Sequence, residues 1–155
     1  MTIETLERTL GEHPFFAGLD AAHLATVVGC ASNVKFEAGD FIFRDGDPAD
    51  HFYVLRQGKV SVEIFAPVRG PIRIDTLEEG DVLGFSWLFP PYRSHFDNRA
   101  ITFVRALALD GKCLREKCER DPVLGYALMK RFAQVVMQRL EATQLQFLDV
   151  YGDPT

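Results

Sequence analysis

The stretch that decides the fold runs from Gly39 to Val62 and reads GDFIFRDGDPADHFYVLRQGKVSV. It contains three glycines, two of them beside aspartates, with apolar segments between them. Glycine reaches the positive φ values that tight turns require, so each glycine predicts a corner between two strands. The residues expected in the core of this stretch are Phe41, Phe43, Phe52, Tyr53, Val54 and Leu55.

The same pattern extends on both sides of this stretch, from residue 33 to about residue 110. Its segments are short and rich in Val, Ile and Phe, and Gly70 and Gly80 mark further corners. Seven or eight strands at this spacing predict a small antiparallel β-roll or jelly-roll barrel. Strands and helices do not alternate along the chain, so a doubly wound parallel sheet is not expected.

Helical patterns precede and follow the strands. Thr2 and Asp20 are expected to cap two short helices before residue 30, and Asp110 a third one after the roll. Asp121, with Pro122 in the first helical position, opens a long helix that runs to about residue 149. We therefore predict one α+β domain over residues 1–155, with N-terminal helices (1–32), a β-roll (33–110) and C-terminal helices (111–150).

The long helix carries two apolar faces. Leu128, Phe132 and Val135 form one face, which is expected to cover the roll. The other face alternates by threes and fours, as in a coiled coil, through Tyr126, Met129, Ala133, Val136, Leu140, Thr143, Phe147 and Val150. This second face predicts a homodimer seam; the alternative is that both faces are buried within one chain.

Composition and charge argue against several kinds of partner. The 155 residues carry a formal net charge of −5, with 47% hydrophobic and 25% charged residues, which suits one folded domain. We expect no membrane partner and a cytoplasmic location, because no apolar run approaches the roughly 18 residues of a span and no signal peptide begins the chain. The mild acidity argues against nucleic acid as a partner. Cys30, Cys113 and Cys118 are expected to be reduced thiols.

The Gly39–Val62 stretch resembles the cyclic-nucleotide-binding domain, the β-roll module of catabolite-activator-type regulators, nucleotide-gated channels and kinase regulatory subunits. The family pattern G-D-x-I-F-x-x-G-D-x-x-D-x-F-Y-x-L-x-x-G-x-V-x-V matches almost position for position, and the likeness extends over residues 13 to about 150. It implies a non-catalytic sensor of a cyclic nucleotide such as cAMP or cGMP, without a further cofactor. Regulators of this family add a DNA-reading helix-turn-helix, and none is expected before the chain stops at Thr155. The signal is expected to pass through the dimer seam or to a protein partner.

The resemblance also places a phosphate-binding cassette at Gly84–Thr102 (GFSWLFPPYRSHFDNRAIT). By position Gly84 is its turn glycine, and Arg99-Ala100 resembles the Arg-Ala pair that opens the next strand. The implied phosphate ligands are Arg99, Ala100 and the backbone N–H groups of Phe85, Ser86, Trp87 and Leu88. Helix N-termini and guanidinium groups suit phosphate oxygens. The alternative is that Arg99 is an ordinary surface arginine.

Two departures from the family pattern leave the ligand open. Phe85 stands where the family has a glutamate for the ribose hydroxyl, and residues 90–98 form an insertion. In one interpretation, Arg93, His95 and Arg99 converge on a larger or more highly charged anion. In the other, aromatic and apolar side chains fill the pocket and leave a dimerisation or partner-binding module without nucleotide: Phe85, Trp87, Leu88, Phe89 and Phe96. A further possibility is that Trp87 stacks on a purine.

The enzyme hypothesis has little support in the sequence. A β-roll resembles the cupin barrel, and many cupins bind a catalytic metal through clustered histidines. The four histidines here, at positions 13, 23, 51 and 95, are scattered, and no GxSxG or P-loop motif occurs. We therefore expect neither a metal site nor catalysis.

Overall fold

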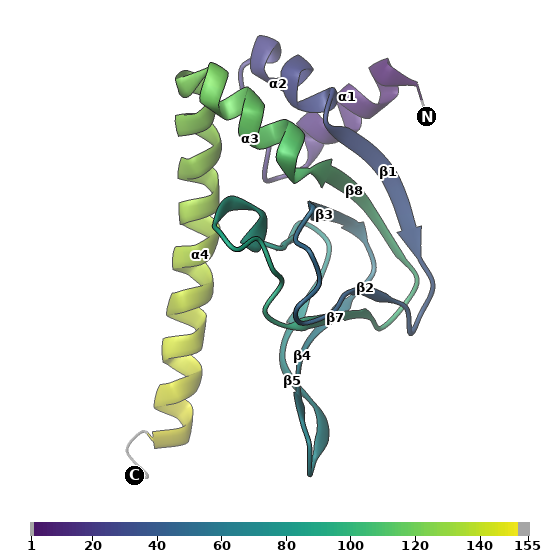
Figure 1. Cartoon of the computed structure of the whole chain (residues 1–155), viewed down its shortest axis with the longest axis vertical. Coiled ribbons are helices and arrows are strands. Elements are labelled where there is room, and N and C mark those ends of the chain that lie inside the picture. Colours follow the sequence, from purple (N-terminus) through teal and green to yellow (C-terminus); the bar gives the residue numbers. More distant parts are fainter. Residues whose placement is uncertain (1, 152–155) are drawn as a thin grey trace.

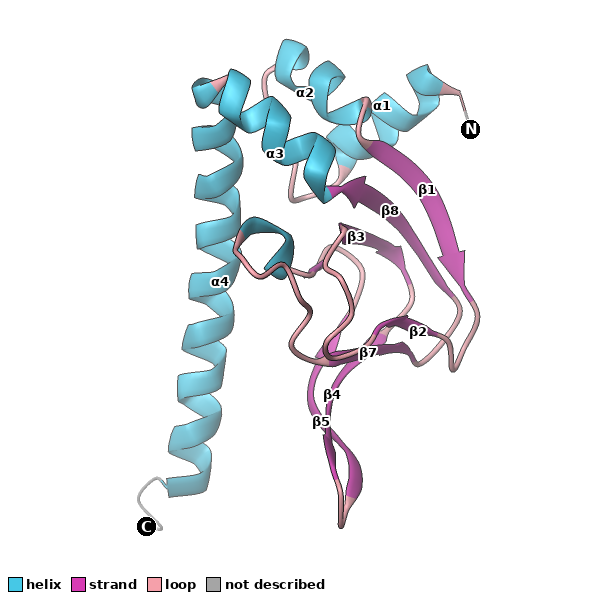
Figure 2. Ribbon diagram, in the orientation of Figure 1, coloured by secondary structure: helices cyan, strands magenta, loops and turns pink. Residues whose placement is uncertain are grey.

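The computed structural model describes residues 2–151. They form three layers, namely a group of helices and two four-stranded sheets (Figure 1, Figure 2). The helices are α1 (Ile3–Glu12), α2 (Ala21–Val28), the one-turn η1 (Ser86–Leu88), α3 (Gly111–Arg120) and α4 (Pro122–Tyr151). The strands are β1 (Ala31–Phe36), β2 (Phe41–Phe43), β3 (His51–Gln57), β4 (Val60–Ala66), β5 (Gly70–Leu77), β6 (Val82–Leu83), β7 (Asp97–Ala100) and β8 (Val104–Asp110). This is the predicted α+β architecture, although the first strand begins at residue 31 rather than 33.

Both sheets are antiparallel and together form the β-roll. One sheet has the strand order β1-β8-β3-β6 and the other the order β2-β7-β4-β5. Because side chains alternate between the faces of a strand, each sheet sends every second residue into the space between the sheets. Leu55 and Ala106 from the first sheet meet Val60, Leu77 and Ala100 from the second in one buried cluster.

The other face of the first sheet packs against the helices. Phe52 and Leu109 are fully buried there, together with Leu10 of α1, Leu114 of α3 and Phe132 of α4. Burial of each such side chain stabilises the fold by about 1.5–3 kcal/mol, so this cluster fixes the helices to the roll.

The predicted helix caps are confirmed. Thr2 accepts a hydrogen bond from the Thr5 N–H group, and Asp20 and Asp110 cap α2 and α3 in the same way. The Asp121 carboxylate accepts from the N–H groups of Val123 and Leu124 at the start of α4. Such caps satisfy donors that have no partner within the helix and contribute about 1 kcal/mol each.

Helix α4 has one covered face, as predicted. Leu128 and Phe132 are buried and Val135 packs against the same core. The predicted seam is divided: Met129 also packs against the core and Thr143 lines a cleft, whereas five further members are exposed, namely Tyr126, Ala133, Val136, Leu140 and Phe147. The Val150 side chain lies outside the described part of the chain.

The expectation of three reduced thiols is wrong for two of them. Cys30 and Cys113 form a disulfide with a Cα–Cα distance of 5.8 Å, and Cys118 is free. The bond connects the turn before β1 to the first turn of α3, 83 residues apart. Sequence spacing did not indicate this pair, because the antiparallel pairing of β1 with β8 brings the two positions together.

We expect reduction of this disulfide to lower the free energy of unfolding by about 2–4 kcal/mol, because the long loop it closes restricts the unfolded chain. Urea unfolding of the wild type with and without dithiothreitol measures this difference. Cys30→Ser/Cys113→Ser should have the lower stability under both conditions, whereas Cys118→Ser should keep the response to reductant. Identical wild-type midpoints in the two buffers would contradict the prediction.

Candidate functional site

The main candidate site is an open cleft of about 1330 Å³ between the roll and α4. The turn from Gly84 to Ser86 forms one part of its wall, and the Pro14–Ala17 link between α1 and α2 forms another. The inner face of the second sheet contributes Phe43, Val62 and Asn98. Helix α4 closes the opposite side with Lys130, Arg131, Gln134, Val135, Gln138, Arg139, Ala142, Thr143 and Gln146.

The beginning of the predicted cassette lies at this cleft. Gly84 has a φ of +91°, and a Cβ built there would lie 3.4 Å from the His51 carbonyl oxygen. Glycine is therefore the residue that this turn requires. Phe85 and Ser86 follow it along the cleft wall, and η1 begins without a side-chain cap. Three of the seven predicted site residues thus meet at the cleft: Gly84, Phe85 and Ser86.

The next two cassette residues face the core. Trp87 is fully buried, with its ring stacked on Phe52 at 4.9 Å and tilted against Phe132 at 5.5 Å between centroids. Leu88 packs against the same cluster. Trp87 is not among the residues that line the cleft. Trp87 and Leu88 therefore fill the core beside the cleft, whereas Phe85 and Phe96 line the cleft and Phe89 is exposed.

Arg99 lies on the other side of the second sheet. Its neighbours Asn98 and Ala100 face the cleft and the roll core, so strand alternation directs Arg99 to the outer face. There its Nη2 atom lies 2.8 Å from Glu63 Oε2. Ser61, which is paired with Arg99 in register, donates a second hydrogen bond of 2.7 Å to the same oxygen.

Glu63 is a buried carboxylate, only 3% exposed. Burial alone would raise the pKa of Glu63, but the hydrogen bonds from Ser61 and Arg99 and the charge of Arg73 hold it below its usual value. Arg73 also donates to Ser61 at 3.1 Å. On the outer face, ion pairs and hydrogen bonds therefore compensate the charge of the Glu63 carboxylate and already engage the Arg99 guanidinium.

The structure does not bring Arg93, His95 and Arg99 together. The exposed Arg93 contacts the Gly46 carbonyl oxygen, His95 lines the cleft, and Arg99 is paired with Glu63. Ala100 is buried in the roll, and its N–H group donates to the Asp40 carbonyl oxygen at 2.8 Å. The Ala100 N–H group therefore already has its hydrogen-bond acceptor in the turn before β2.

Two arginines that sequence analysis did not single out connect the helices to the cassette and to the strand before it. Arg139 of α4 donates to the Val82 carbonyl oxygen, and its guanidinium carbon lies 5.0 Å from the Phe85 ring centroid. Arg115 of α3 donates to the Trp87 carbonyl oxygen and lies 4.2 Å from the Tyr92 centroid. Both lie far from the cassette in sequence, and no local motif marks them.

The cleft combines charges of both signs. Lys130, Arg131 and Arg139 on α4 face a wall that includes Asp75 and Asp81. Burial lowers the pKa of Arg139, and the two aspartates act in the opposite direction. An arginine stays protonated at neutral pH even so. Arg131 already donates to two carbonyl oxygens, those of Ala127 and Ala17, whereas Arg139 donates to one, that of Val82. Lys130 and Arg139 therefore keep more donors for an anionic ligand than Arg131 does.

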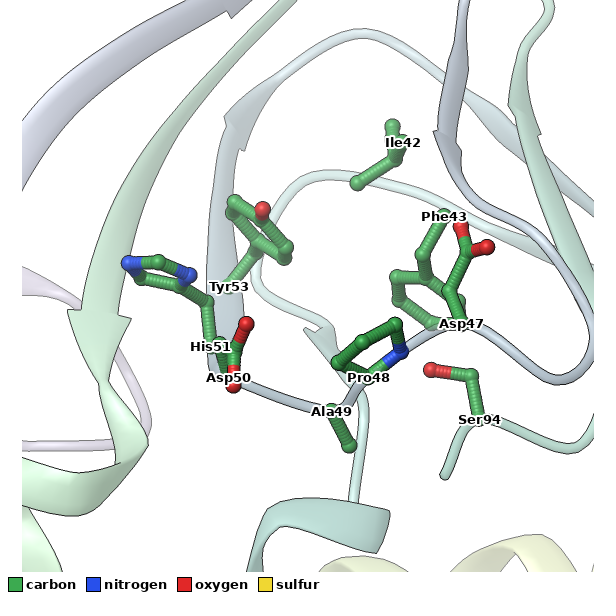
Figure 3. Close-up of a pocket in the computed structure, with 9 residues that line it drawn as sticks. All are labelled: Ile42, Phe43, Asp47, Pro48, Ala49, Asp50, His51, Tyr53 and Ser94. Atoms are coloured by element: carbon green, nitrogen blue, oxygen red, sulfur yellow. The ribbon is translucent and has the colours of Figure 1, made fainter. Parts of the chain in front are cut away.

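A second cavity, of about 180 Å³, opens beside the start of β3 (Figure 3). It is lined by Ile42, Phe43, Asp47, Pro48, Ala49, Asp50, His51, Tyr53 and Ser94. Burial, followed by the charge of Asp50, raises the pKa of Tyr53. With two carboxylates and no lysine or arginine in its lining, this cavity is unsuited to an anion.

Within residues 2–151, no group of three His, Cys, Asp or Glu side chains is arranged to hold a metal ion. In the same part of the chain, no helix is both long and apolar enough to cross a membrane.

Known proteins share this architecture. The chain is 26% identical over 152 residues to a CRP-like cAMP-activated global transcriptional regulator of Mycobacterium tuberculosis. The alignment covers 95% of this chain and 66% of that regulator. The N-terminal domain of a transcriptional regulator from Streptomyces coelicolor has a TM-score of 0.67 at 28% identity, covering 86% of this chain and 95% of that one. A cyclic nucleotide-binding domain from Methylobacillus flagellatus has a TM-score of 0.78 at 16% identity, covering 95% and 83%, which supports the fold alone.

The family model for the cyclic nucleotide-binding domain matches residues 33–121. This range contains all eight paired strands except the first two residues of β1, together with η1 and α3. It is more than half of the 155 residues. The chain belongs to the cyclic nucleotide-binding domain family.

Proposed function

We propose that the cleft binds a cyclic nucleotide or a closely related anionic small molecule, and that the chain is a non-catalytic sensor or regulatory domain. The observation that carries the proposal is the meeting of Gly84–Ser86 with α4 across a cleft of about 1330 Å³, in a member of this family. Ordinary small-molecule sites measure roughly 300–1,000 Å³, so the cleft has room for a mononucleotide.

Arg139 is the residue we propose for the anionic group of the ligand. Arg139 lines the cleft and contacts the cassette through Phe85, next to its hydrogen bond to the Val82 carbonyl oxygen, whereas Arg115 is not among the residues that line the cleft. Phe85 has no carboxylate for a ribose hydroxyl, and its ring offers a flat apolar surface instead. Arg99 would first have to release Glu63 and pass to the other face of β7, which favours Arg139 over the sequence-based hypothesis of an Arg99 phosphate ligand.

The same contact supplies a mechanism. A ligand anion that takes hydrogen bonds from Arg139 competes with the Val82 carbonyl oxygen for that guanidinium. Because Arg139 is fixed to α4, a new partner for it changes where α4 rests against the roll. The ligand thus shifts the population of α4 positions by the difference of its affinities for them.

A thermal-shift experiment with cAMP, cGMP and cyclic dinucleotides tests the proposal. A ligand at about 100 times its Kd adds about 2.7 kcal/mol and should raise the Tm by roughly 5–10 °C. Arg139→Met should weaken binding by about 10- to 150-fold, since a hydrogen bond to a charged group contributes about 1.5–3 kcal/mol. Arg120→Met, at the exposed end of α3, is the matched control. No shift with any nucleotide would favour a dimerisation or partner-binding module without nucleotide.

Arg99→Ala distinguishes Arg99 from Arg139 as the residue that binds the anionic group of the ligand. We expect it to lower the free energy of unfolding by about 1–2 kcal/mol, less than the cost of breaking a fully buried pair, because the Arg99 side chain is 38% exposed. Glu63→Gln in the same chain should recover most of this loss, because it removes the unpaired charge. Nucleotide affinity should stay within about twofold of the wild type. A loss of binding in Arg99→Ala, measured by calorimetry on folded protein, would restore Arg99 as the phosphate ligand.

We also propose that the exposed seam of α4 pairs with a second copy of the chain. Tyr126 is 70% exposed and Leu140 is 56% exposed, on the side of the helix away from the core. Leu140→Glu should shift the sedimentation-equilibrium mass from dimer to monomer, because two carboxylates would face each other in the seam. Gln138→Glu places the same charge on the cleft side and should leave the mass unchanged. A wild-type monomer at high concentration would refute the seam.

A further inference from the structure

The hairpin formed by β4 and β5 extends beyond its sheet. Only Val60–Glu63 of β4 pair with β7, whereas Ile64–Ala66 pair with β5 alone. The end of the hairpin is therefore a two-stranded ribbon, and it projects away from the rest of the roll (Figure 1). A two-stranded ribbon is marginally stable by itself in water. The side chains that it exposes therefore indicate which surroundings would stabilise it.

The ribbon is apolar on both of its faces. Phe65 pairs with Pro71, and the adjacent pair is Ile64 with Ile72. Because neighbouring pairs point to opposite faces, one face carries Phe65 and the other carries the two isoleucines. Phe65 is 64% exposed and Val68, at the turn, is 98% exposed. Apolar side chains on both faces and at the turn suit a lipid phase, which surrounds an inserted tip on every side.

The charge of the ribbon is positive, although the chain as a whole is negative. Residues 64–74 (IFAPVRGPIRI) contain Arg69 and Arg73 and no acidic residue. Arg73, at the base of the ribbon, belongs with Arg99 to the network around Glu63, so Arg69 is the cation at the tip. At physiological ionic strength charges are screened beyond about 8 Å, so a surface that meets the tip senses Arg69 first and the distant carboxylates little.

We propose that this tip inserts into the interface of an anionic phospholipid surface. Val68 lies three positions after Phe65, in the turn, so the two are at most about 10 Å apart along the chain, within the roughly 5–10 Å depth that interfacial apolar groups occupy. Arg69 beside them can extend its guanidinium to the headgroups while its methylenes remain among apolar atoms. This peripheral contact differs from the sequence-based expectation of no membrane partner, and it needs neither a membrane span nor a bound nucleotide.

Co-sedimentation of the full chain with vesicles tests the inference. We expect binding to phosphatidylcholine vesicles that contain about one-third phosphatidylserine, and weak binding to phosphatidylcholine alone. Val68→Asp should lower the partition coefficient about tenfold, because the valine no longer leaves water. Arg69→Gln should lower it about fivefold on the anionic vesicles and leave it unchanged on the neutral ones. Neither change affects the core, since both residues are exposed.

Ile3→Asp is the matched control, because Ile3 is 73% exposed at the start of α1, away from the hairpin. It should bind the anionic vesicles as the wild type does. Absence of wild-type binding, or equal losses in Val68→Asp and Ile3→Asp, would overturn the inference. A change of sedimentation mass in Val68→Asp without lipid would also overturn it, because the tip would then be an interface between copies of the chain.

Discussion

The contacts around Phe132 are the constraint on which the candidate site depends. The Phe132 ring of α4 lies 5.1 Å from Phe52 of β3, 4.7 Å from Phe15 and 5.5 Å from Trp87 of η1, measured between centroids. One side chain thus joins the long helix to the roll, to the link between α1 and α2, and to the cassette. Close-packed cores do not deform continuously, so η1 and α4 move together or not at all. A ligand that displaces either element is therefore sensed by both.

Much of this architecture follows from local sequence. Each strand begins or ends near a glycine or an aspartate that turns the chain, and each long helix begins at a side chain that accepts its first N–H groups. These are short-range effects, so Asp20, Asp110 and Asp121 could be recognised as caps from their neighbours alone. The buried face of α4 was predictable for the same reason, because a period of 3.6 residues is visible within one segment.

The site was less predictable, because it depends on which side of a strand a residue faces and on which distant residues meet. A shift of one position along β7 exchanges the two faces of the sheet. Asn98 therefore lines the cleft, and Arg99 meets Glu63 on the outside. No neighbour of Arg99 in the sequence reveals this pairing, since Glu63 lies on another strand. The contacts of Arg115 and Arg139, and the Cys30–Cys113 disulfide, join segments that only the tertiary fold brings together.

The two halves of α4 differ in their contacts. Its first half is held by Leu124, Leu128 and Phe132 in the core, while its second half borders the cleft on one side and exposes Leu140 and Leu148 on the other. Arg139 lies in this second half, at the contact with Val82 and Phe85. A change at Arg139 acts on a helix that is anchored at only one end, so a small local displacement becomes a larger one toward the C-terminal end. The proposed function then implies that a partner covering the apolar side chains of that end responds to the cleft without touching the ligand, because both lie on the same helix.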